Sequence, residues 1–346
     1  MSEKISEKSV SEQTSSRKTD HVKIALEKNV QHSTPTGFDE IEFLHYALPE
    51  LNFDAIDTTV TFLKRNFSLP FMVLSMTGGH ESVERINKDI ALACEEKNIP
   101  MGVGSQRAML EKPELAKTFK VKDVAPNVFL CGNIGGYQLK NYSIDKIEKM
   151  ICDIEADALC IHLNPLQEVV QPEGDRNWAG VLKAIEKTCS QLDVPIIAKE
   201  VGAGLNVDVC RELEAAGVAA IDVSGTGGTS WAGIEVYRKG AEAGNLYWNW
   251  GVPTVIALQE AAKTVKIPLI ASGGVRNGLH VAKALRLGAT LAGAASPFLK
   301  AQNTGGADGV KKEIEKWEKE LKIAMFLTRS KDLATLKKAK LLNAIN

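Results

Sequence analysis

Short apolar runs recur along the chain after residue 70, and segments of helical length separate them. Continuous apolar runs of four or five residues, bounded by glycine or polar residues, are typical of strands that are buried on both faces. The segment at 83–97 instead has apolar residues three and four positions apart, which predicts an amphipathic helix. Eight runs fit the strand pattern, at 71–74, 99–103, 127–131, 158–161, 194–198, 219–223, 268–271 and 289–292.

Polar and glycine-rich turns come after these strands rather than before them. That order predicts an α/β fold, a (β/α)8 TIM barrel within residues 70–346, in which the loops after the strands build the active site on one face. A doubly wound open sheet is the alternative, but it would place one dominant glycine-rich turn after an early strand. Here glycine turns follow the first, second, third, sixth, seventh and eighth strands.

The segment before the barrel divides into two parts. Residues 1–16 are rich in Ser, Glu and Lys, which predicts a disordered tail. Residues 17–69 are irregular and predict an N-terminal extension or cap, with a short helix at 22–28 and a strand-like alternation at 39–43. Later in the chain, the pattern predicts terminal helices at 310–326 and 333–345, and residues 236–249 form an insertion without a recognisable motif.

The composition narrows the choice of partners and compartment. The 346 residues carry a formal charge of -1, so the chain has no general attraction for nucleic acid. The six cysteines occur singly, without a C-x-x-C pair, which favours free thiols in a reducing compartment. No apolar run reaches the roughly 18 to 20 residues of a membrane span, and the first residues lack the apolar core of a signal peptide. We therefore expect a cytoplasmic protein with no nucleic-acid or membrane partner.

Two glycine turns give the clearest ligand signal. Residues 272–276 and 293–295 follow the seventh and eighth strands, where backbone N–H groups and helix amino termini favour an anion. Phosphate binding after these two strands recurs in this barrel. The alternative is that the glycines serve only tight turns. Lys199, at the end of the fifth strand, could stabilise the anionic edge of a reduced flavin, or it could pair with the Glu200 carboxylate.

Further candidate chemistry lies on the loop after the fourth strand. Glu168 suits Mg2+, which commonly takes one or two carboxylates, several waters and substrate phosphate oxygens; the alternative is a solvated loop acid. His162, Arg107 and the pair Arg17-Lys18 could hold a diphosphate, although Arg17-Lys18 also fits the solvated start of a helix.

Twelve collinear motifs spread over about four-fifths of the chain resemble the type 2 isopentenyl diphosphate isomerases, a family of flavin-dependent enzymes. The motifs are RKTDH (17–21), ALPE (47–50), SMTGG (75–79), GSQR (104–107), GNIG (132–135), HLNPLQE (162–168), PEGDR (172–176), KEVGAG (199–204), VSGTGGTSWAGIE (223–235), WGVPT (250–254), SGGVRNG (272–278) and GAA (293–295).

The resemblance implies interconversion of isopentenyl and dimethylallyl diphosphate with FMN, Mg2+ and NADPH as reductant, in a homo-oligomer that is usually a tetramer or octamer. It implies metal binding by Glu168 and a catalytic centre with His162, Asn164 and Gln167. It implies substrate contacts from Arg17, Lys18, Ser105, Gln106, Arg107, His162, Asn164 and Gln167. It implies FMN contacts from Ser75, Met76, Thr77, Ser105, Asn133, Lys199, Ser224, Thr229, Gly273, Gly274, Val275, Ala294 and Ala295.

The implied reaction fits the residues that the sequence offers. A 1,3-proton shift needs an acid and a base close to the alkene in a dry pocket, and no pair of carboxylates is evident at the predicted barrel mouth. Reduced FMN could serve as acid and base in their place. Two alternatives stay open: an FMN barrel oxidoreductase of the 2-hydroxy acid oxidase or dihydroorotate dehydrogenase type, and a flavin-binding regulatory barrel without catalysis.

Overall fold

The computed structural model describes residues 10–342, with the side chains of all of them except residues 10–17 and 19. Eight parallel strands close into a barrel in the order β10-β3-β4-β5-β6-β7-β8-β9. Because β10 pairs with both β3 and β9, the sheet has no open edge, and the predicted TIM barrel is confirmed over the open sheet. The barrel strands are β3 (Phe71–Val73), β4 (Met101–Gly102), β5 (Leu130–Gly135), β6 (Ala158–Leu163), β7 (Ile196–Glu200), β8 (Ala220–Asp222), β9 (Leu269–Ala271) and β10 (Leu291–Ala294).

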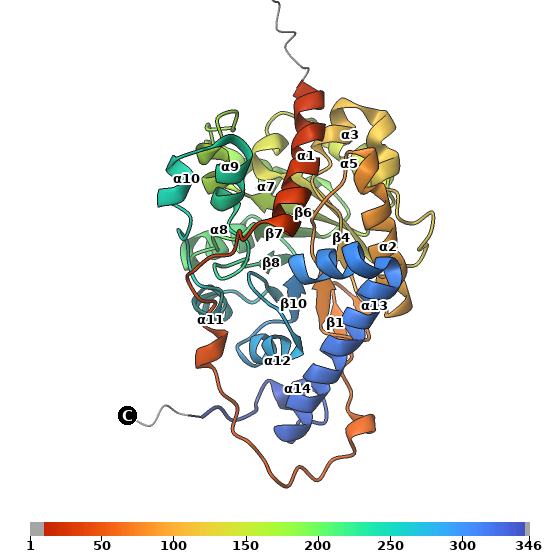
Figure 1. The fold of residues 1–346 in the computed structure, drawn as a ribbon, viewed down its shortest axis with the longest axis vertical. Coiled ribbons are helices and arrows are strands. Elements are labelled where there is room, and N and C mark those ends of the chain that lie inside the picture. Colours follow the sequence, from red (N-terminus) through yellow and green to blue (C-terminus); the bar gives the residue numbers. More distant parts are fainter. Residues whose placement is uncertain (1–9, 343–346) are drawn as a thin grey trace, which may run out of the picture.

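Helices surround the barrel and explain why its strands read as continuous apolar runs (Figure 1). Every residue of β5 and β7 is buried, since one face packs inside the barrel and the other against helices. The helices are α2 (Glu84–Glu96), α3 (Arg107–Glu111), α4 (Gly136–Leu139), α5 (Ile144–Cys152), α6 (Pro165–Val170), α7 (Val181–Gln191), α8 (Val207–Ala215), α9 (Trp231–Lys239), α10 (Ala243–Leu246), α11 (Thr254–Thr264), α12 (Gly278–Arg286), α13 (Ser296–Leu327) and α14 (Leu333–Leu336). Short 3-10 helices add Phe38–Glu40, Phe53–Ala55, Glu81–Val83 and Pro113–Thr118. None of the helices in the described range is long and apolar enough to cross a membrane.

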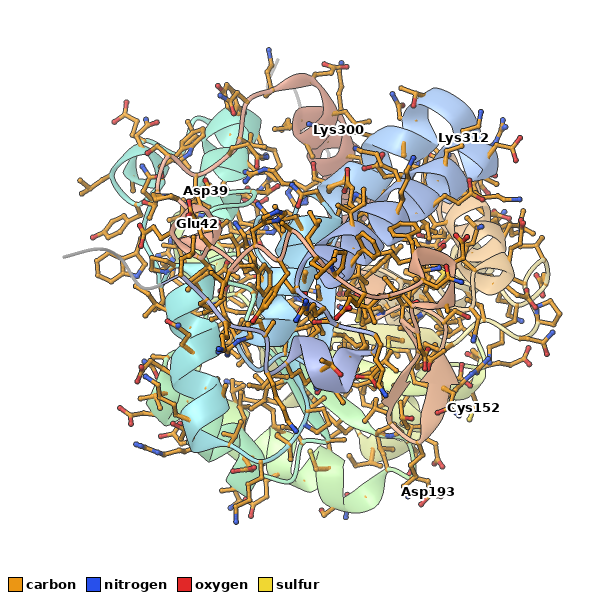
Figure 2. The ribbon with its side chains drawn as sticks, turned by 90° about the horizontal axis from the view of Figure 1, so that it is seen from below. Asp39, Glu42, Cys152, Asp193, Lys300 and Lys312 are labelled. Atoms are coloured by element: carbon orange, nitrogen blue, oxygen red, sulfur yellow. The ribbon has the colours of Figure 1, made fainter. Side chains whose placement is uncertain are left out.

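An antiparallel hairpin, β1 (Val60–Phe62) and β2 (Arg65–Phe67), comes just before the first barrel strand. Phe62 and Phe67 are buried in one cluster with Met72, Phe129 and Leu291 from the barrel strands and their approaches. The hairpin therefore packs at the amino end of the barrel and leaves the opposite end for ligands. Figure 2 separates the two ends: Lys300, which follows β10, lies far from Cys152 and Asp193, which precede β6 and β7.

The N-terminal extension differs from its prediction in two places. The helix predicted at 22–28 is part of a longer one, α1 (Val10–Glu27), which already includes the first described residue, and residues 1–9 lie outside the described range. α1 packs against α3, α9 and α13 (Figure 1). The strand predicted at 39–43 is wrong: the region holds a 3-10 turn, and only Phe43 forms a bridge, with Leu341.

The extension is held to the barrel by a buried lysine. Lys283 on α12 donates a hydrogen bond to the carbonyl of Phe38, 2.8 Å away. Burial lowers the pKa of Lys283, and the carboxylates of Asp39 and Glu42, which lie close together in Figure 2, partly oppose this shift.

The C-terminal helices also differ from the pattern. α13 starts at Ser296, directly after β10, and bends at Gly306, where φ is 59°. The predicted helix at 310–326 is only its second half, because the first half carries polar residues and three glycines. α14 ends at Leu336 rather than 345, and residues 343–346 lie outside the described range. The insertion at 236–249 contains the end of α9 and the short α10.

Candidate active site

The carboxyl ends of the eight parallel strands meet at one end of the barrel, and the predicted site residues lie on these ends or on the turns after them. Lys199 in β7 and the Gly273 turn after β9 therefore share one face. The others come from the turns after β3 (Ser75, Met76, Thr77), β4 (Ser105, Gln106, Arg107) and β8 (Ser224, Thr229), from β5 (Asn133) and β6 (His162), from α6 and the residue before it (Asn164, Gln167, Glu168), and from the ends of β9 and β10 (Gly273, Gly274, Val275, Ala294, Ala295).

The turns after β8 and β9 interlock through glycine. Gly273 and Gly274 have φ values of 98° and 71°, a region that side chains disfavour. A Cβ on Gly273 would lie 2.0 Å from the carbonyl oxygen of Gly225, and one on Gly228 would lie 2.5 Å from the nitrogen of Gly274. These glycines are therefore required by close backbone packing as well as by φ. They do not serve the turn alone, because they bring two strand ends together.

A segment of the extension crosses these turns. The His32 N–H donates to the Gly228 carbonyl, and the Ser230 N–H donates to the Val30 carbonyl. A Cβ on Gly274 would lie 2.4 Å from the Thr36 side chain. Residues 30–36, which we name the strap, therefore form a wall of the site. The irregular sequence of the extension gave no signal for this contact.

Several groups around this part of the mouth suit a bound FMN. The hydroxyls of Thr77 and Thr226 are buried and have no hydrogen-bond partner within the described part of the chain. Where α13 begins, directly after β10, no described side chain caps the helix, so its amino terminus can receive a phosphate. A buried hydroxyl without a hydrogen-bond partner destabilises the folded chain unless a ligand or a water molecule bonds to it. The residues present therefore fit a phosphorylated, hydrogen-bonding cofactor.

Lys199 is buried, and its register partners are His162 in β6 and Asp222 in β8. Its ammonium donates to the backbone carbonyl of Glu200, while the Glu200 carboxylate accepts N–H groups from residues 201–204. The suggested side-chain pairing of Lys199 with Glu200 is therefore replaced by two separate sets of backbone contacts. Burial raises the pKa of Asp222, and the charge of Lys199 opposes that shift.

The loop after β6 is a connected polar cluster. The Asn164 amide donates to Gln167 Oε1 at 3.0 Å and to Glu168 Oε1 at 2.9 Å. The other Glu168 oxygen accepts from the Gln171 amide and, at 2.8 Å, from the Asp175 N–H. Glu168 is only 7% exposed, so the alternative of a solvated loop acid is wrong.

This cluster fits a hard cation that also takes ligands from water and substrate. No group of three or more His, Cys, Asp or Glu side chains that could hold a metal occurs among residues 10–342 with described side chains. A carboxylate oxygen of Glu168 and an amide oxygen of Gln167 nevertheless converge on the same Asn164 amide. One carboxylate with a neutral oxygen beside it is a donor set suited to Mg2+.

Glu235 joins this cluster, although no sequence pattern predicted a role for it. It is fully buried in α9 and accepts from Gln167 Nε2 at 3.0 Å, from His21 Nε2 at 3.1 Å and from Arg238 Nε at 2.6 Å. Burial alone would raise the pKa of Glu235, but the hydrogen bond and charge of His21, with Gln167 and Arg238, lower it to about 2. Glu235 is the last residue of the 223–235 motif, and this position was the one sequence signal that could have identified it as a site residue.

Helix α1 reaches the mouth through Lys18 and His21. Lys18 donates to the carbonyl of Ser105 and lies over the Phe119 ring, 5.1 Å from its centroid. His21 reaches Glu235. The Arg17 side chain lies outside the described part of the structure, although its backbone is in α1. The predicted basic clamp is thus placed at the mouth through Lys18.

The two neighbours after β4 behave differently. Arg107 is half-buried and pairs with Glu111 at 3.1 Å and with Asp175 at 3.3 Å. Gln106 is fully buried, and its amide bonds to the Met109 sulfur, the Met150 carbonyl and the Asn133 N–H. The Gln106 side chain therefore points beneath the loop and supports it, so the predicted substrate contact of Gln106, which stays a prediction, would have to come from its backbone. Glutamine beside arginine in a polar motif does not reveal which side chain points inward.

A cavity of about 1130 Å3 lies beside the site rather than at its centre. α6, α7 and α8 line it with largely apolar side chains, and the exposed Tyr247 and Trp250 lie at its edge. It shares Leu166 and Glu200 with a small pocket that Gln167 lines. The chemistry is at the strand ends, because the titratable groups converge there.

Comparisons with known proteins agree with this geometry. The model of the FMN-dependent dehydrogenase family matches residues 164–343. The isopentenyl-diphosphate delta-isomerase of Pyrococcus abyssi (strain GE5 / Orsay) is 47% identical over 342 residues, covering 95% of this chain and 92% of its own. That of Methanosarcina acetivorans is 46% identical over 323 residues, covering 91% of this chain and 88% of its own.

Solved structures show the same barrel at low identity. Mandelate oxidase with (S)-2-phenylpropionate superposes with a TM-score of 0.67 at 17% identity, covering 97% of this chain and 99% of its own. Lactate oxidase of Pediococcus acidilactici superposes with a TM-score of 0.66 at 16% sequence identity, covering 94% of this chain and 87% of its own. These two similarities show the fold alone, whereas the sequence relatives show the family. The chain belongs to the type 2, FMN-dependent isopentenyl-diphosphate delta-isomerases.

Proposed function

We propose that this isomerase interconverts isopentenyl and dimethylallyl diphosphate by a 1,3-proton shift, with FMN and Mg2+ bound at the carboxyl end of the barrel. The observation that supports this most is the buried cluster of Asn164, Gln167 and Glu168 on the same face as the glycine turns and Lys199. It supports a cation site built from side-chain oxygens and an anion site built from backbone groups around one opening.

The flavin half of this proposal uses backbone and buried polar groups. Lys199 would place its charge against the flavin ring, and α13 with the 273–275 turn would hold the phosphate. When bound and reduced, FMN would supply the acid and base for the proton shift. The remaining proposed FMN contacts come from Ser75, Met76, Thr77, Ser105, Asn133, Ser224, Thr229, Ala294 and Ala295.

The substrate half uses charged and amide side chains. Glu168 would bind Mg2+, and Arg17, Lys18, Ser105 and Arg107 would hold the diphosphate. His162, whose Nδ1 donates to Asn133 Oδ1 at 2.9 Å, would present its other nitrogen to a phosphate oxygen. Asn164 and Gln167 would orient substrate and metal. NADPH as the reductant and a tetrameric or octameric homo-oligomer rest on the family resemblance alone.

The test is a turnover assay. Protein loaded with FMN is mixed anaerobically with isopentenyl diphosphate, Mg2+ and NADPH, and dimethylallyl diphosphate and NADPH are measured together. We expect many product molecules for each NADPH consumed, because the isomerisation has no net redox change. Chelation of Mg2+ with EDTA should stop product formation.

The competing function is oxidation of a 2-hydroxy acid, since the solved mandelate and lactate oxidases share this fold. The same loaded protein should therefore be given mandelate or lactate with oxygen. Oxidation of either acid, together with no isomerisation by fully reduced protein, would overturn the proposed function. A flavin-binding barrel without catalysis would bind FMN and do neither.

A further inference from the structure

The turn at 172–176 connects two parts of the site that are distant in sequence, the arginine after β4 and the carboxylate of α6. We propose that Asp175 is a positioning residue that couples Arg107 to Glu168, so that diphosphate binding and metal binding strengthen each other. This inference rests on the proposed function, because it assumes that Arg107 holds a diphosphate and that Glu168 holds a divalent cation.

The side chain of Asp175 is tied to Arg107. Its Oδ2 accepts from Arg107 Nη1 at 3.3 Å and from Gln138 Nε2 at 3.1 Å. Arg107 also donates through Nε to Glu111 Oε1 at 3.1 Å. A guanidinium has five N–H donors, so these two contacts orient it and still leave donors for a phosphate oxygen.

The backbone of the same residue is tied to Glu168. The Asp175 N–H donates to Glu168 Oε2 at 2.8 Å, and the Asp175 carbonyl accepts from Trp178 Nε1 at 2.9 Å. The preceding Gly174 lies against the backbone of α6, since a Cβ there would lie 1.7 Å from the Glu168 carbonyl oxygen. The turn therefore has little room to move without moving Glu168.

These contacts form one continuous chain from Arg107 through the Asp175 side chain and backbone to the Glu168 carboxylate. A phosphate that draws Arg107 toward the mouth pulls on the carboxylate of Asp175, and the N–H of the same residue then changes its contact with Glu168. Binding at one end must alter affinity at the other by the same factor, because coupling between two ligands is reciprocal. Partners that orient a metal-binding carboxylate typically change metal affinity about 10- to 100-fold when removed.

Glu111 provides a matched control within the same site. It also pairs with Arg107, but from one turn along α3, and within the described part of the chain its side chain forms no hydrogen bond with the 172–176 turn. Asp175→Asn and Glu111→Gln each remove one carboxylate charge from the same guanidinium. Only the first change acts on the residue that reaches Glu168.

The experiment measures binding without turnover, in FMN-loaded protein. Mn2+ replaces Mg2+ and is titrated by electron paramagnetic resonance, with and without inorganic pyrophosphate. In wild type we expect pyrophosphate to tighten Mn2+ binding. Asp175→Asn should weaken Mn2+ binding roughly 10-fold and largely remove the effect of pyrophosphate, whereas Glu111→Gln should keep the Mn2+ Kd within about twofold of wild type.

A second variant guards against misfolding. Gly174→Ala keeps the Asp175 side chain but displaces the turn from Glu168, so it should also lose at least about 10-fold in Mn2+ affinity. Equal Mn2+ affinity in Asp175→Asn and Glu111→Gln, or wild-type affinity in Gly174→Ala, would overturn the coupling. If wild type isomerises its substrate in either case, the proposed function stands without the coupling. If wild type couples the two ligands but forms no dimethylallyl diphosphate, the proposed function fails instead.

Discussion

The two halves of the barrel mouth are built by different means. In the flavin half, the ends of β7 to β10 and of β3, contacts come mainly from backbone groups and glycine positions such as Gly273 and Gly228. In the substrate half, α1, α6 and the ends of β4 to β6, charged and amide side chains bond to one another, as Arg107 and Glu168 do. The first arrangement could receive the proposed flavin without breaking side-chain pairs, whereas the proposed substrate and metal would compete with the existing pairs of the second.

The match to the FMN-dependent dehydrogenase family does not follow this division. It begins at residue 164, so it includes α6 with β7 to β10 and leaves out β3 as well as β4, β5 and β6.

The strongest test of a rigid flavin half is Gly273→Ala. The new Cβ would meet the Gly225 carbonyl oxygen at 2.0 Å, and φ is 98°, so the turn must move. We expect the FMN Kd, measured by fluorescence quenching, to rise at least about 100-fold, or about 2.8 kcal/mol. Gly305→Ala is the control, since nothing lies within 4 Å of its Cβ position and it is in α13. Unchanged FMN affinity in Gly273→Ala would remove the distinction between the halves.

The next test separates the halves by function. Glu168→Gln keeps the size of the side chain but removes the charge proposed to hold Mg2+. We expect kcat/KM to fall at least about 100-fold, since metal clamps supply several kcal/mol of transition-state stabilisation. The FMN Kd should stay at the wild-type value. Glu212→Gln, an exposed acid on α8, serves as the control and should retain wild-type turnover. Loss of FMN together with activity would show that the two halves fold as one unit.

The third test measures the folding stability that a buried carboxylate gives to the substrate half, rather than binding or turnover. The pKa of Glu235 is lowered to about 2 from an ordinary value of 4.5, so its charge stabilises the folded chain above pH 4.5. That contribution, on the order of 3 kcal/mol, is lost as pH falls from about 4.5 to 2. Urea unfolding should show Glu235→Gln less stable than wild type at pH 7, with the difference shrinking toward pH 3.

The control for this measurement is Glu260→Gln. Glu260 forms an exposed pair with Lys263 on α11, at 2.9 Å. Its loss should change stability by less than about 1 kcal/mol, as for other surface pairs. Equal changes in the two variants at pH 7 would mean that the buried network around Glu235 adds no special stability.

Local patterns predicted the barrel and the positions of the glycine turns at its mouth, because each strand and the turn after it are neighbours in sequence. The substrate half depends on pairs that no local pattern encodes. His21 meets Glu235 across 214 positions, and Arg107 meets Asp175 across 68. The inward amide of Gln106 was missed for the same reason, since its partners include Met150 on α5.

The start of α1 was missed for a different reason. Residues 10–16 have the polar composition of a disordered tail, and composition is all that the sequence offers there. In the structure these residues are nevertheless helical. They extend the later turns of α1, which pack against α3, α9 and α13. The contacts of Lys18 and His21 tie α1 to the barrel mouth, and no local pattern encodes them.

The strap over the glycine turns has a consequence for how the protein folds. Residues 30–36 precede the whole barrel in the sequence, while β9 and β10, whose ends they help to enclose, are its last two strands. The strap can therefore dock fully only on a barrel whose last two strands have already formed.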